Sequence, residues 1–269
     1  MTRRSKHYRD WCLHAALGLS LATTPQIARA QDTFEIQVYE YETVPKNRWN
    51  LETHFNLTVN GTHDFQGTVS PTNNQRHLTF ELTRGITNYF ELAGYLVLAD
   101  RPGRGAEYAG YRVRPRVRAP ESWGLPFRFS LSVEVGFPRA AYEENSATLE
   151  VRPILERRFG RVLVDLNPVV GRALKGPGSN DGWDFEPGLR LGYGASKKLD
   201  LSVEYYASTG DSDALPVKEP VHLLFPGFDY HFNDDVVLNF GYGFGLTSAG
   251  DKGILKMRLG VLFGSASKK

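Results

Sequence analysis

The sequence has 269 residues, of which 41% are hydrophobic and 23% are charged, and its net charge at pH 7 is +2. Such a small net charge argues against nucleic acid or an anionic membrane surface as a partner. No run of eighteen apolar residues occurs, which argues against a membrane-spanning helix, so any role within a membrane falls to strands.

Residues 1–30 have the parts of a secretory signal peptide. A basic head is followed by an apolar stretch, Trp11 to Ala22, and by the small-x-small motif Ala28-Arg29-Ala30. Signal peptidase accepts such a motif, so we expect cleavage after Ala30; an ordinary amphipathic helix is the alternative. The only cysteine, Cys12, lies in this segment, so the mature chain has no disulfide and no cysteine nucleophile or metal ligand.

Residues 31–46 precede the first clear strand and are assigned to a periplasmic N-terminal segment. Within this segment, Glu35 to Glu40 alternate between polar and apolar side chains as a strand does. The segment can add a strand in the periplasm or fold into the lumen of a barrel as a plug. Both alternatives fit the sequence.

From residue 47 onward, apolar and polar residues alternate with a period of two. Most of these segments run about ten residues, the length that a tilted strand needs to cross a bilayer. We predict twelve strands, and bacterial single-chain barrels have an even number. The predicted strands cover residues 47–59, 75–84, 89–99, 107–118, 127–137, 147–157, 161–171, 183–193, 198–207, 221–232, 236–246 and 253–263.

One face of these strands is apolar and aromatic, whereas the other carries the charges. A soluble barrel of the lipocalin type has the same period, with its apolar face inside. The lengths of the connections favour a membrane barrel, because short periplasmic turns and longer outer loops are typical of outer-membrane proteins. The short connections are 85–88, 158–160, 194–197 and 233–235, and the long ones are 60–74, 138–146, 172–182 and 208–220.

Aromatic residues at the strand ends favour the same interpretation, because an interfacial girdle needs apolar rings that tolerate a wet rim. The predicted girdle consists of Trp49, Phe90, Phe127, Tyr193, Phe232 and Phe263. The last predicted strand alternates and closes on Phe263, as the signal for the barrel-assembly machinery does. Residues 264–269 form a C-terminal tail beyond it.

Prolines within the predicted strands argue against a membrane barrel. Each lacks an N–H group and leaves a ladder carbonyl unpaired, which is costly in hydrocarbon. The sequence offers no reason for them. They are Pro115, Pro153, Pro168, Pro187 and Pro226.

Four stretches resemble the outer-membrane barrels grouped with the meta-pathway phenol-degradation proteins. They are Arg84-Gly85-Ile86-Thr87-Asn88-Tyr89-Phe90-Glu91-Leu92, Leu166-Asn167-Pro168-Val169, Phe185-Glu186-Pro187-Gly188-Leu189-Arg190 and Asp229-Tyr230-His231-Phe232-Asn233-Asp234-Asp235-Val236. The resemblance implies a fold and an outer-membrane location, with solute uptake as a loose association. It implies no catalytic motif.

An arginine ladder is the most distinctive chemical feature. Arg112, Arg114, Arg116 and Arg118 are spaced by two, which puts their guanidinium groups on one face of one strand. Four like charges in a confined lumen need partners. The residues predicted to line the lumen with charge are Glu91, Arg112, Arg114, Arg116, Arg118, Arg128, Glu134, Glu150, Arg152 and Glu156.

Two interpretations of the ladder remain open. In one, arginines and acids form a salt-bridged network that fills and closes a narrow barrel. In the other, the ladder is an electropositive track that attracts anionic solutes. Twelve strands lie between the filled eight-stranded barrel and the open sixteen-stranded porin, so both are sterically possible. We favour a network that lines a narrow channel.

The eleventh predicted strand presents glycines to the lumen. Gly241, Gly243 and Gly245 share this face, and we hypothesise that they leave space for whatever lies between the walls. The alternative is that they accommodate curvature, a common use of strand glycines.

An enzyme is the second class considered, because outer-membrane phospholipases use a Ser-His-Asn arrangement on the lipid-facing side. His54, His77, His222 and His231 are the strand histidines, and none has a serine two residues away on its own strand. No Gly-x-Ser-x-Gly elbow occurs either. We therefore expect no enzyme, no catalytic residues, no metal and no cofactor.

Together these patterns predict an all-β, antiparallel up-and-down transmembrane β-barrel of about twelve strands over residues 47–263. We expect a monomer in outer-membrane lipid that passes small, anionic or aromatic solutes passively. The alternative is a closed structural or lipid-modifying barrel.

Overall fold

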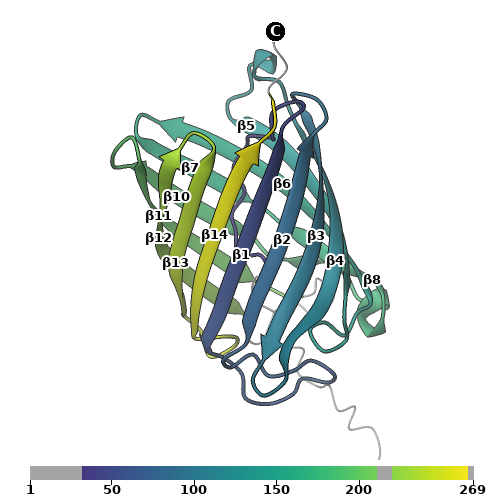
Figure 1. Ribbon diagram of the computed structural model, residues 1–269. Helices are drawn as coiled ribbons and strands as arrows, with labels where there is room; N and C mark the ends of the chain where they lie inside the picture. Colours follow the sequence, from purple (N-terminus) through teal and green to yellow (C-terminus); the bar gives the residue numbers. More distant parts are fainter. Residues whose placement is uncertain (1–31, 211–219, 266–269) are drawn as a thin grey trace, which may run out of the picture.

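The computed structural model describes residues 32–210 and 220–265, so the predicted signal peptide over residues 1–30 and most of the C-terminal tail lie outside the described residues. The described residues form one antiparallel sheet that closes on itself through the pairing of β5 with β6 (Figure 1). The strands are β1 (Trp49–Asn60), β2 (Arg76–Gly85), β3 (Phe90–Arg101), β4 (Gly105–Arg118), β5 (Arg128–Pro138), β6 (Ala147–Phe159), β7 (Val162–Asn167), β8 (Val170–Lys175), β9 (Asp184–Phe185), β10 (Gly188–Gly194), β11 (Leu199–Ser208), β12 (Val221–Asn233), β13 (Val236–Gly245) and β14 (Gly253–Phe263).

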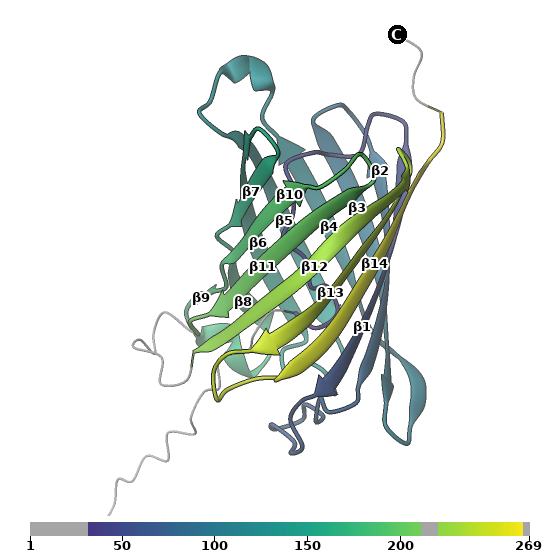
Figure 2. The ribbon, with the colours of Figure 1, turned by 90° about the vertical axis from the view of Figure 1, so that its left-hand side faces the viewer.

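Fourteen segments make twelve barrel strands, because two strands are each interrupted once. β7 and β8 both pair with β6, and their partners on the other side are β10 and β9. The predicted antiparallel twelve-stranded barrel is therefore confirmed. The strands tilt steeply against the barrel axis (Figure 2). None of the helices in the described residues is long and apolar enough to cross a membrane.

The two interruptions lie at Pro168 and Pro187. Together with Pro153, which lies opposite Pro168, these are three of the five prolines within the predicted strands. The pairs Leu155–Leu166 and Val151–Val170 on either side of the gap put Pro153 opposite Pro168. The pairs on the other side of β7 and β8 put Pro187 opposite Pro168 as well. Because the prolines face one another across neighbouring strands, they share one interruption of the ladder.

The charged face points inward and the apolar face outward. Leu96 on β3 is 46% exposed, whereas Glu91 on the same strand is completely buried. The opposite arrangement, with the apolar face inside as in a lipocalin, is wrong for this chain. An apolar exterior around an interior that holds the charged side chains is the arrangement of a barrel that crosses a membrane.

The connections differ at the two ends. The turns 86–89, 160–161, 195–198 and 234–235 lie at one end, which we call the short-turn end, and the longer loops 61–75, 139–146, 176–183 and 246–252 lie at the other, the loop end. Two of the connections that are described in full depart from this pattern. The link 102–104 at the loop end is short, and 119–127 at the short-turn end is long because it contains the 3-10 helix η1 (Glu121–Trp123).

Candidate functional site

Residues 32–46, which we call the plug, run through the lumen of the barrel. Near the loop end, the Phe34 ring lies 5.5 Å from the Tyr142 ring of loop 139–146. At the short-turn end, the N–H of Asn47 donates to the carbonyl of Gly85 (2.9 Å), and the chain then enters β1. No ladder pairing involves the plug in the part of the chain that is described. The segment that we assigned to the periplasm thus lies inside the barrel.

Side chains of the wall hold the plug by its backbone. The N–H of Tyr39 donates to Asn167 Oδ1 (2.7 Å), and Asn167 Nδ2 donates to the Tyr39 carbonyl (3.0 Å). The N–H of Val44 donates to Glu91 Oε2 (2.6 Å), and that of Tyr41 to Glu156 Oε2 (2.9 Å). Extended backbone has polar groups that β-pairing normally satisfies, and here wall side chains take that role.

The half of the arginine ladder nearer the loop end, Arg112 and Arg114, pairs with acids of both the wall and the plug. Arg112 lies 3.1 Å from Glu134 and also forms an ion pair with Asp32 of the plug. Arg114 is buried and bridges Glu91 (3.0 Å) and Glu81.

The half nearer the short-turn end, Arg116 and Arg118, makes equivalent contacts. Arg116 lies 2.8 Å from Glu91 and donates to the backbone carbonyls of Glu40 and Glu42. Arg118 lies 2.6 Å from the Glu42 carboxylate. Of the other predicted charges, Arg128 pairs with Glu156 (3.1 Å) and Arg152 with Glu150 (2.8 Å). The ladder therefore binds the plug along its length.

Tyr39 is the centre of these contacts. Its ring centroid lies 4.4 Å from the guanidinium carbon of Arg152, 4.9 Å from that of Arg114 and 5.5 Å from that of Arg116. Its hydroxyl donates to Glu35 and lies 3.1 Å from the Tyr95 hydroxyl. An aromatic ring among guanidinium groups is attracted through its quadrupole, so this residue anchors the plug.

A second ionic cluster lies on the opposite wall. Arg190 lies 3.0 Å from Glu40 of the plug and 2.5 Å from Asp229. Lys256 pairs with Glu204 (2.5 Å) and donates to the plug carbonyl of Ile36 (3.3 Å). The sequence interpretation missed the plug acids as partners of the lumen cations. Their density in residues 32–42, next to a ladder that needs anions, was the available signal.

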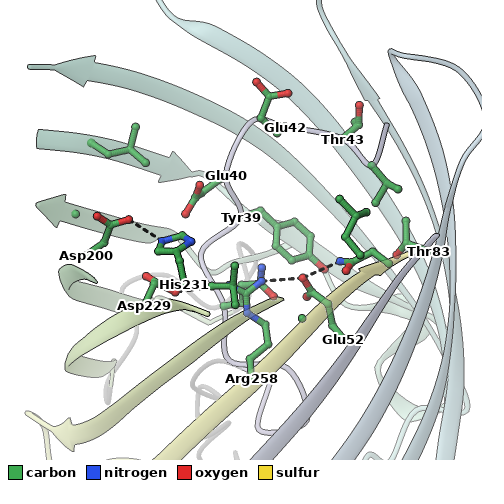
Figure 3. Close-up of a pocket in the computed structure, with 18 of the residues that line it drawn as sticks. Tyr39, Glu40, Glu42, Thr43, Glu52, Thr83, Asp200, Asp229, His231 and Arg258 are labelled. Carbon is green, nitrogen blue, oxygen red and sulfur yellow. Dashed lines mark hydrogen bonds and ion pairs between the residues drawn. The ribbon is translucent and has the colours of Figure 1, made fainter. Parts of the chain in front are cut away.

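A cavity of about 430 Å³ remains between the plug and the wall toward the short-turn end. Figure 3 shows Tyr39 and Glu40 of the plug on one side, with Asp200, His231 and Arg258 facing them from the wall. Charged residues make up half of its lining, so it is suited to water and polar solutes.

The glycine face of β13 leaves no open space, and our hypothesis that it does is wrong. A Cβ atom on Gly243 would lie 2.2 Å from Cζ of Phe225, and one on Gly245 would lie 2.2 Å from the carbonyl oxygen of Asp251. A Cβ on Gly241 would lie 3.2 Å from Cε of Lys256. The absent side chain at Gly243 makes room for the buried Phe225 ring of β12.

The aromatic residues predicted to form a girdle lie at the short-turn end of their strands or in the adjoining connection. Phe90 is half-buried, and the others are exposed on the barrel exterior. They are Trp49, Phe127, Tyr193, Phe232 and Phe263. The Arg84 guanidinium carbon lies 4.9 Å from the Trp49 ring.

The strand histidines do not form a hydrolase triad. His77 hydrogen-bonds with Gln75 (3.0 Å), His231 with Asp200 (3.0 Å) and the exterior His222 with Tyr205 (2.5 Å). None of these partners, found among the described residues, is a serine. The lipid-modifying alternative therefore gains no support from the geometry.

The chain matches no family model and no curated protein. Among solved structures, it is similar to the KdgM porin, at 11% identity and a TM-score of 0.48 over 80% of this chain and 99% of that one. It is also similar to the translocator domain of autotransporter NalP from Neisseria meningitidis (12%, TM-score 0.47, 81% and 88%). A third similar structure is LpxR from Salmonella typhimurium, at 9% identity and a TM-score of 0.43 over 80% of this chain and 100% of that one. Such low values indicate nothing about substrate or activity.

Proposed function

We propose that the protein is a monomeric outer-membrane channel for small anionic or aromatic solutes, and that the plug closes it. The observation that carries this proposal is that a chain segment held by hydrogen bonds to the wall occupies the lumen, where a narrower barrel would be filled by side chains of its own wall. A bore that admits an extended polypeptide has the width for a small solute once that segment withdraws.

The contacts of the plug suggest the class of solute. Tyr39 presents an aromatic ring to three guanidinium groups, and Asp32 and Glu42 present carboxylates to Arg112 and Arg118. An aromatic anion offers the same two chemistries. The resemblance of four motifs to barrels of the meta-pathway phenol-degradation group points in the same direction.

The location rests on three features of the chain. They are the apolar exterior, the signal-like residues 1–30 and the alternating last strand that closes on Phe263. An exterior of this kind is stable in lipid. We expect the barrel-assembly machinery to recognise the alternating last strand.

A flux assay on proteoliposomes tests the solute class. We expect benzenesulfonate to enter faster than trimethylphenylammonium, a cation of comparable size. Replacing Arg112 and Arg118 with Ala should remove this preference, because these two arginines lose carboxylate partners when the plug withdraws. Arg104→Ala, in the exposed link 102–104, is the matched control and should keep it. Equal rates for both ions in the parent protein, or no flux of either ion even after residues 32–44 are removed, would contradict the proposal.

A further inference from the structure

Three ionisable side chains from different elements converge in the middle of the lumen. They are Glu35 of the plug, His54 of β1 and Glu81 of β2, and each offers an atom within 4.8 Å of the other two. All three side chains are at least nine-tenths buried. Because 19 or more residues separate them along the chain, no sequence motif announces the cluster.

Two atoms of this cluster are buried without a hydrogen-bond partner among the described residues: Nε2 of His54 and Oε2 of Glu81. They lie 3.7 Å apart, and Oε2 of Glu52 lies 3.6 Å from the same nitrogen. These separations exceed a hydrogen bond. Polar atoms buried in this way are unfavourable and call for a further partner.

The remaining contacts fix the carboxylates in place. Oε1 of Glu81 accepts from Thr83 (2.7 Å) and from Arg114, which leaves its other oxygen directed toward His54. Glu35 accepts from the hydroxyl of Tyr39, the anchor of the plug. The carboxylates that could bind a metal ion are therefore held in place by neighbouring side chains, as the ligands of metal sites are.

We propose that Glu35, His54 and Glu81 bind one divalent transition-metal ion, with Zn²⁺ as the best-suited ion. An imidazole nitrogen favours zinc and its neighbours in the first transition row over Ca²⁺ and Mg²⁺, which prefer oxygen ligands alone. Three protein ligands leave a fourth tetrahedral position for water. Because one ligand belongs to the plug and two to the wall, the ion joins the plug to β1 and β2.

Ion pairing among the side chains alone is the competing explanation of the same geometry. His54 lies within ion-pair distance of both Glu52 and Glu81, and this pairing would offset the carboxylate charges without a metal ion. The two explanations differ in one measurable respect, since only the first gives saturable binding of Zn²⁺ that depends on Glu35.

The test is a titration of the metal-free, refolded full-length protein with Zn²⁺ by isothermal calorimetry, with the bound metal counted by mass spectrometry. We expect one Zn²⁺ per chain. His54→Ala and Glu35→Gln should each weaken binding at least about tenfold, since even loss of an outer-shell contact costs this much. His63→Ala, in the exposed loop 61–75, is the control and should bind as the parent does.

Folding of each variant is checked by heat-modifiable gel mobility, and Glu35→Gln alters no strand of the barrel. Absence of saturable binding, or unchanged affinity in both variants, overturns the proposal. If His54→Ala weakens Zn²⁺ binding and Glu35→Gln does not, Glu35 is no ligand and the ion does not join the plug to the wall. The readout is metal binding, so a failure of the proposed channel function leaves it unaffected.

Discussion

The guanidinium carbon of Arg152 lies 4.4 Å from the centre of the Tyr39 ring, and this contact joins the wall of the barrel to the plug. Arg114 and Arg116 approach the same ring. Tyr39 thus contacts three cations of the wall at once, each of which also pairs with an acid of the wall.

Tyr39→Ala is expected to loosen the plug. Buried cation–π contacts contribute about 2 kcal/mol, and each 1.4 kcal/mol changes an equilibrium constant about tenfold. The open probability in single-channel recordings should therefore rise about tenfold or more. Tyr39→Phe keeps the ring and loses only the hydroxyl contacts, so its open probability should lie between those of Tyr39→Ala and the parent protein. If Tyr39→Ala leaves the open probability unchanged, Tyr39 is not the anchor.

Arg114→Ala is expected to destabilise the barrel strongly, because it leaves Glu81 and Glu91 buried without their shared cation. Breaking a buried ion pair on one side costs about 3–5 kcal/mol. Arg118→Ala is the matched control on the same strand. Its partner Glu42 is largely exposed, so the cost should stay below about 1 kcal/mol. Guanidinium-induced unfolding in detergent measures both, and equal losses would contradict this assignment.

Gly243→Ala should destabilise the barrel by about 1–3 kcal/mol, because the new methyl group overlaps the buried Phe225 ring. Phe225→Ala in the same chain removes the overlap, so the two substitutions should cost less together than the sum of their separate costs. The control is Gly94→Ala, where a Cβ meets no atom within 4 Å. Additive costs in the double variant would show that Gly243 and Phe225 do not compete for space.

Leu96→Arg tests whether the exterior contacts lipid. Leu96 is exposed on the apolar face of β3, and an arginine on the lipid face costs about 2–4 kcal/mol at the bilayer midplane. Phe65 is an exposed residue of loop 61–75, so Phe65→Arg should leave the free energy of folding almost unchanged. The measurement is the free energy of folding into liposomes. Indistinguishable values for the two variants would argue against a membrane-embedded face.

The strand pattern could be predicted because a period of two determines both the strand and its two faces. The charges on one face and the apolar residues on the other already indicated the twelve strands and the ionic interior. The interruptions at Pro168 and Pro187 could not be placed in this way. Their alignment with Pro153 depends on the register between three strands, and register is a long-range property.

The plug could not be placed from its own sequence, since its alternation fits an added strand equally well. What decides its position is the partners of Arg112 and Arg118, which are Asp32 and Glu42, 80 and 76 residues earlier in the chain. The face of the glycines was predicted correctly, but the volume of Phe225 on the neighbouring strand was not considered. Spacing reveals which residues share a face and leaves open what they contact.

Single-channel conductance of the protein with and without residues 32–44 tests the central claim most directly. Residues 45–48 are kept, because Asn47 attaches this part of the chain to Gly85. We predict that the shortened barrel, verified by its heat-modifiable mobility, conducts steadily and favours anions, while the full-length protein is mostly closed. A correctly folded shortened barrel that carries no current would show that the lumen is not a passage.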